Sequence, residues 1–60
     1  MRTAAIIHFI SGEKFETSET FEEINSALDE LDYTIEVTSP DRYRKLVFIS
    51  TITYIEEIYK

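Results

Sequence analysis

The stretch from Thr20 to Asp32, TFEEINSALDELD, decides the fold. Its apolar side chains recur at positions that share one stripe of a helix, namely Phe21, Ile24, Ala27, Leu28 and Leu31. Thr20 followed three residues later by Glu23 predicts a capping box, in which each side chain accepts a hydrogen bond from the other residue's amide. We therefore expect a helix that begins after Thr20 and ends near Leu31, and a sheet that covers its apolar stripe.

The opposite face of this helix is acidic, and it carries Glu22, Glu23, Asn25, Ser26, Asp29 and Glu30. No Lys or Arg occurs between residues 15 and 41, so the usual i,i+4 pairs of a solvated helix are absent. The acids near the C-terminal end also oppose the helix dipole, so local helix stability does not explain them. Two interpretations stay open: a solvated face, or a surface that recognises a basic partner.

Two segments before the helix predict a hairpin. The first, residues 3–10, is apolar on both faces, so we expect cover from the helix on one side and, in a dimer, from a second subunit on the other. Ser11-Gly12 predicts a turn, and residues 14–17 return as a second strand. A loop of two or four residues places Phe15 on the face of His8 and Glu16 on the face of Ile7.

A second hairpin is expected after the helix. Residues 33–38 alternate, with Tyr33, Ile35 and Val37 inward, and residues 39–42 predict a type I turn with proline in second position. Folding back around this turn pairs Glu36 with Lys45, Ile35 with Leu46, and Tyr33 with Phe48.

The C-terminal stretch admits two interpretations. Residues 45–49 predict a strand and Ser50-Thr51 a bend or bulge. Residues 52–59 predict a further strand, or else a short helix that begins with a second Thr-Glu capping box; we favour the strand. The expected fold is a single α+β domain over residues 1–60. In it, an antiparallel sheet of four to five strands has one amphipathic helix packed on one face (ββαββ).

The composition limits the classes of function. A chain of 60 residues without cysteine builds a small core, so we expect a homodimer or a tight partner complex. The net charge of −6 argues against direct binding to nucleic acid or to an anionic membrane, and it permits binding to a basic protein surface. No export signal or membrane span is visible, which fits a cytoplasmic location.

The sequence offers no motif for catalysis, a metal or a cofactor. The carboxylates lack the spacing of a calcium loop, and no residue at a motif spacing supports His8 as a base. We expect His8 to pack beside Phe15 or at a dimer contact, and we expect no enzymatic activity. Three basic residues surround Tyr43, namely Arg42, Arg44 and Lys45; this pattern occurs in nucleic-acid contacts, but edge protection explains it better in an acidic chain.

Two segments resemble a known group of proteins. The pattern IHFISGEKFE (residues 7–16), then a capped acidic helix, then ITYIEEI (residues 52–58) resembles short acidic proteins of phages and mobile elements of low-GC Gram-positive bacteria. In outline it is similar to the small phage inhibitors of uracil-DNA glycosylase. The resemblance implies DNA mimicry, in which carboxylates stand where phosphates would and an apolar groove grips the enzyme. It transfers no functional residue to this chain.

The expected function is that of a non-enzymatic inhibitor or modulator of a basic protein, such as one that binds nucleic acid. Tyrosine is enriched at protein interfaces, so exposed tyrosines join the acidic face as candidates, whereas Tyr33 is assigned to the core and Tyr59 is a further candidate. The expected partner-binding residues are Glu22, Glu23, Asp29, Glu30, Tyr43 and Tyr54. The alternative is a structural or assembly module that associates with itself through the apolar first strand.

Overall fold

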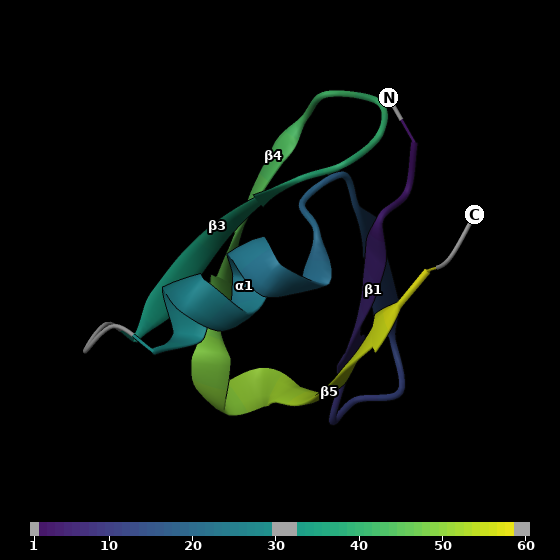
Figure 1. The fold of residues 1–60 in the computed structure, drawn as a ribbon. Helices are drawn as coiled ribbons and strands as arrows, with labels where there is room; N and C mark the ends of the chain where they lie inside the picture. Colours follow the sequence, from purple (N-terminus) through teal and green to yellow (C-terminus); the bar gives the residue numbers. More distant parts are fainter. Residues whose placement is uncertain (1, 30–32, 59–60) are drawn as a thin grey trace.

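The computed structural model describes residues 2–29 and 33–58 of the chain. The elements are β1 (Ala5–Phe9), β2 (Lys14–Thr17), α1 (Phe21–Leu28), β3 (Thr34–Thr38), β4 (Arg44–Phe48), the 3-10 turn η1 (Ile49–Thr51) and β5 (Ile52–Glu57) (Figure 1). The ββαββ order is as predicted. The interpretation of the C-terminal segment as a strand is confirmed, and the expected bend before it is a turn of 3-10 helix.

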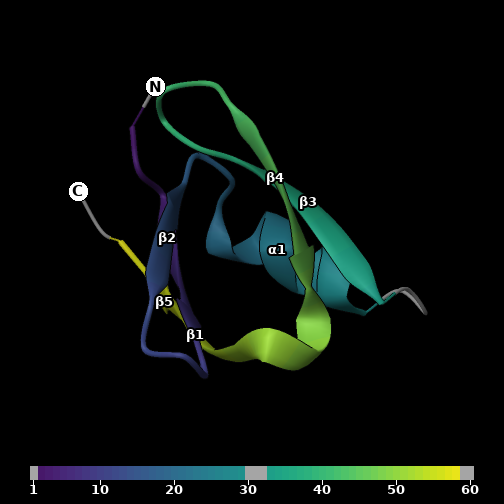
Figure 2. The ribbon, with the colours of Figure 1, turned by 180° about the vertical axis from the view of Figure 1, so that it is seen from behind.

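The strands form two antiparallel sheets, so the prediction of a single sheet is wrong. One sheet has the order β2-β1-β5 and the other is the β3–β4 hairpin. In both views the hairpin and the three-stranded sheet stand on opposite sides of α1 (Figures 1 and 2). Among the described residues, one backbone bond links the end of β2 to β3, from the amide of Ser18, which follows β2, to the Thr38 carbonyl at 2.8 Å. A single bond at a corner does not extend into a ladder, which explains the division into two sheets.

The core lies between the two sheets and the helix. It contains Ala5, Ile7, Phe15, Ile24, Ile35, Val37 and Val47. The predicted helix stripe is correct in its centre, because Ile24 is buried while Ala27 and Leu28 pack partly buried against the core. Phe21 at the N-terminal end is more exposed. The helix ends at Leu28, earlier than predicted, and Leu31 lies outside the described residues.

The first hairpin differs from the prediction by one residue. Its loop has three residues, because the Phe9 amide donates to the Glu13 carbonyl at 2.9 Å and Gly12 takes a φ of 94°. A type I turn followed by a left-handed residue is a standard three-residue hairpin loop. An odd loop reverses the parity, so Phe15 lies opposite Ile7 on the buried face and not on the face of His8.

The second hairpin is shifted for the same reason. The predicted turn is present, since the Arg42 amide donates to the Ser39 carbonyl at 2.9 Å. Arg42 then adopts a φ of 73°, which inserts one more residue before the strand resumes. Ile35 therefore faces Val47, and Leu46 faces outward opposite Glu36. The predicted pairs of Ile35 with Leu46 and of Tyr33 with Phe48 are wrong.

The prediction that Tyr33 belongs to the core is wrong. Ile35 and Val37 are buried as predicted, but β3 begins at Thr34, so Tyr33 precedes the strand and is 88% exposed. On β1, Ala5 and Ile7 are buried as expected, while Ile6 and His8 on the outer face are half-buried. Cover of that outer face by a second subunit stays a prediction.

Candidate protein-binding site

The N-terminus of α1 has the predicted capping box. The Thr20 amide donates to Glu23 Oε1 at 2.8 Å, and the Glu23 amide donates to Thr20 Oγ1 at 3.2 Å. The hydrogen bonds that Glu23 receives from the Thr20 backbone and from its side chain lower the pKa of Glu23 below its ordinary value of 4.5, because they favour the charged form. Glu23 is therefore part of the helix cap, although it was predicted as a partner-binding residue.

A groove runs between α1 and β5. It has a volume of about 310 Å³, and it is lined by Phe21, Asn25 and Leu28 of the helix and by residues 52–55. Successive side chains of a strand point to opposite faces, so a groove lined by four consecutive strand residues runs along the strand's edge. Within the described part of the chain, β5 pairs with β1 alone, which leaves this edge open beside the helix.

Carboxylates flank one of the helix residues that line the groove. At 100° per residue, Glu22 and Asp29 lie beside Asn25 on the helix surface, and both are exposed. Neither α1 nor β5 contains a Lys or Arg. Among residues 2–29 and 33–58, neither carboxylate takes part in an ion pair. The groove therefore combines an apolar lining with an uncompensated negative rim.

Tyr54 joins this groove from β5. Its ring stacks on the imidazole of His8, with centroids 4.2 Å apart and planes 14° from parallel. The His8 Nε2 atom lies 3.1 Å from Glu56 Oε1. This carboxylate partner of His8 is 48 residues distant in sequence, so no local motif revealed it. The expectation that His8 packs beside Phe15 is wrong, because the two lie on opposite faces of the sheet.

The other predicted interface residues lie elsewhere. Tyr43 follows the β3–β4 turn and lines a separate groove together with residues of β2. The rings of Tyr43 and Phe15 meet edge to face, with their centroids 6.3 Å apart. The structure thus brings Tyr54 to the acidic helix but leaves Tyr43 apart from it. Glu30 and Tyr59 lie outside the described residues.

Further acidic residues contribute to the fold. Glu19 Oε1 accepts a hydrogen bond from the Thr38 amide at 2.7 Å, which strengthens the corner between the sheets. The Glu36 carboxylate pairs with the Arg44 guanidinium at 3.5 Å. The predicted pairing of Glu36 with Lys45 is wrong, because the shifted register places Lys45 opposite Val37, with its ammonium group near the Phe15 ring. Sequence reasoning missed the role of Glu19, since its partner is nineteen residues away.

Comparison with protein-family models, with curated proteins and with solved structures finds no match to this chain. In residues 2–29 and 33–58, no three His, Asp or Glu side chains lie together as metal ligands would. The helix that the structure describes is too short to cross a bilayer.

Proposed function

We propose that this protein is a non-enzymatic binding module that inhibits or modulates a protein with a basic surface. The groove between α1 and β5 is the contact site. The observation that carries the proposal is that Asn25 and Tyr54 line one apolar groove, and the helical period places the exposed carboxylates of Glu22 and Asp29 beside Asn25. An acidic rim selects cations, and an apolar groove with an aromatic side chain supplies the contacts that hold a complex.

The distance between Glu22 and Asp29 indicates how many cations the partner presents. Glu22 and Asp29 are seven residues apart, which is about 10 Å along a helix that rises 1.5 Å per residue. One basic side chain does not span this distance, so the partner presents at least two cations. Proteins that bind nucleic acid carry such rows of Lys and Arg, and occupation of that row by this chain would block the nucleic-acid site.

Electrostatics in this mode act mainly on encounter. The net charge of −6 attracts a basic partner over a distance of about one Debye length, roughly 8–10 Å at physiological salt. Association therefore slows as salt rises, while the dissociation rate depends on the groove contacts.

The test compares two variants with the same change in charge. Glu22→Gln/Asp29→Asn removes the rim carboxylates and leaves the Thr20–Glu23 cap in place. Glu13→Gln/Asp41→Asn removes two exposed carboxylates of the hairpin loops. In affinity capture from a bacterial lysate, we expect the wild type and the loop variant to retain one basic protein that the rim variant loses.

Two further measurements complete this test. Circular dichroism checks that each bait is folded, and a DNA oligonucleotide should compete with the captured protein if the site overlaps a nucleic-acid site. Equal retention by the rim variant and the loop variant would contradict the proposal.

A second candidate function, self-association, is favoured by a different observation. Leu46 and Phe48 are 62% and 59% exposed on the outer face of the β3–β4 hairpin, whereas Ile7 of the apolar first strand is buried. A homodimer would cover the hairpin face. Sedimentation velocity of the wild type and of Leu46→Ser/Phe48→Ser tests this: a dimer that the double variant dissociates supports self-association, and a monomeric wild type excludes it.

A further inference from the structure

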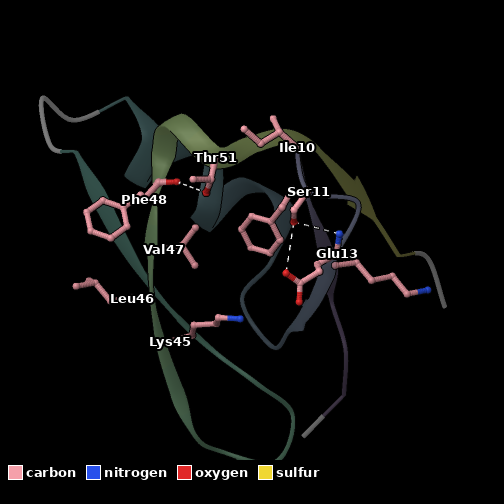
Figure 3. A pocket seen from close by; sticks show the side chains of 10 residues that line it. Ile10, Ser11, Glu13, Lys45, Leu46, Val47, Phe48 and Thr51 are labelled. Atoms are coloured by element: carbon pink, nitrogen blue, oxygen red, sulfur yellow. Dashed lines mark hydrogen bonds between the residues drawn. The ribbon is translucent and has the colours of Figure 1, made fainter.

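A second groove lies between β4 and the tip of the β1–β2 hairpin. It has a volume of about 280 Å³ and is lined by residues 45–48 on one side and by hairpin residues between Phe9 and Lys14 on the other. Figure 3 shows Lys45 and Val47 pointing toward the hairpin while Leu46 and Phe48 point away from it. Because side chains from both faces of β4 border it, the groove runs along the edge of this strand.

The main chain of β4 has unused hydrogen-bonding groups at this edge. The bonds from Ser39 to Tyr43 and from Ile49 to Tyr33 fix the alternation of the β3–β4 ladder. In an antiparallel pair, every second residue directs its amide and carbonyl away from the neighbouring strand. These residues are Arg44, Leu46 and Phe48. The Phe48 carbonyl already accepts a hydrogen bond from Thr51 Oγ1 at 2.6 Å, so at Phe48 the amide is the group that can bind a new strand. In the described part of the chain, β4 has no other neighbouring strand.

The charge of this groove is opposite to that of the molecule. Lys14 and Lys45 line it, with Glu13 as its acidic residue. The Lys45 Nζ atom lies 5.0 Å from the centre of the Phe15 ring and 5.7 Å from that of Phe9. Among the described residues, Lys45 forms no ion pair. The aromatic rings thus hold an ammonium group at the opening of an apolar groove, where a carboxylate would pair with it.

We propose that this groove binds an extended protein segment in which acidic and apolar side chains alternate. The segment adds to β4 as an antiparallel strand, with main-chain bonds to Arg44, Leu46 and Phe48. Its carboxylates lie on the face of Lys45 and meet Lys45 and Lys14, and its apolar side chains lie on the opposite face and pack against Leu46 and Phe48, which are 62% and 59% exposed. Strand addition of this kind takes affinity from the main chain and specificity from the alternate side chains. The site is independent of the acidic α1–β5 groove.

The test uses the full chain, labelled with nitrogen-15, and two capped synthetic peptides of about eight residues, the length of a strand. One peptide alternates valine with glutamate, and the matched control alternates valine with lysine. We expect the glutamate peptide to shift the amide signals of Arg44, Leu46 and Phe48 and to slow their hydrogen exchange. The lysine peptide should leave these three signals unchanged.

Two variants separate the charge from the main-chain contribution. Lys45→Met keeps an apolar chain over the rings and should weaken binding of the glutamate peptide by about tenfold, the effect of one charge-assisted bond. Arg2→Met, which removes a charge elsewhere, should bind as the wild type does. Leu46→Pro removes an amide that points away from β3, so it should abolish binding and preserve the hairpin. If this variant unfolds, a glutamate peptide with N-methylated amides at alternate residues replaces it.

Several results would overturn the proposal. They are no shift at residues 44, 46 and 48 at millimolar glutamate peptide, equal binding of both peptides, or equal effects of Lys45→Met and Arg2→Met. Undiminished binding by folded Leu46→Pro, or of the N-methylated peptide, would equally exclude strand addition.

Discussion

Arg42 adopts a backbone conformation in the β3–β4 turn that is unfavourable for any residue except glycine, so its replacement by glycine should strengthen the fold. Its φ of 73° lies in the left-handed region, which costs an L-residue about 1–2 kcal/mol. Glycine avoids this cost but loses more freedom on folding, about 0.5–1 kcal/mol. The difference predicts that Arg42→Gly raises the free energy of unfolding by about 0.5–1 kcal/mol. At about 4–8 °C per kcal/mol for a domain of this size, the melting temperature should rise by about 2–8 °C.

Urea unfolding followed by circular dichroism measures this effect, with a higher midpoint at an unchanged slope. Two controls separate the backbone from the side chain. Arg42→Ala removes the guanidinium but keeps the strained φ, so it should give no comparable gain. Gly12→Ala introduces strain at the equivalent position, where φ is 94° and an added Cβ meets nothing within 4 Å, so by the same difference it should cost about 0.5–1 kcal/mol. An unchanged or lower midpoint for Arg42→Gly, or an equal gain from Arg42→Ala, would refute the reasoning.

Three further predictions concern side-chain hydrogen bonds. Thr20→Ala removes the helix cap and should lower the free energy of unfolding by about 1 kcal/mol in urea titration, whereas Thr20→Ser should retain most of it. Glu19→Ala should cost about 1.5–3 kcal/mol, because the Thr38 amide loses a charged acceptor, and Glu19→Gln should recover part of the loss. The lowered pKa of Glu23 means that its charge adds stability above the ordinary pKa of 4.5, and this stability is lost as the pH falls through the lower folded value. The wild type should therefore exceed Glu23→Gln in stability at neutral pH and lose that advantage in acid; a constant difference would contradict this.

The sequence was sufficient where the determining contacts are local. The start of α1 followed from Thr20 and Glu23, which are three residues apart and hydrogen-bond as expected. The central helix stripe followed from a helical period, and Ile24 is buried as that period predicts. The β-branched and aromatic residues of the last segment indicated a strand, and β5 pairs with β1 along most of its length.

The strand registers depended on the number of residues in each hairpin loop, which residue types indicate only in part. Both predicted hairpins assumed loops with an even number of residues, and both loops contain a left-handed residue that makes the number odd. Gly12 signals such a position, but Arg42 does not, because arginine has no preference for positive φ. In β4 the neighbours Leu46 and Val47 are both apolar, so hydrophobicity alone did not decide which one faces the core.

Some carboxylates of this acidic chain stabilise the fold, and these must be distinguished from the carboxylates that can bind a partner. Several carboxylates bind groups of the chain itself: Glu16 to Thr3, Glu19 to Thr38, Glu23 to Thr20, Glu36 to Arg44 and Glu56 to His8. Their removal changes stability as well as charge, so neutralisation of the whole acidic face would confuse loss of folding with loss of binding. Glu22 and Asp29 have no such bond among the described residues, and they lie beside Asn25, which lines the groove together with Tyr54. A loss of partner binding on their substitution, with stability unchanged, would therefore be due to recognition and not to the fold.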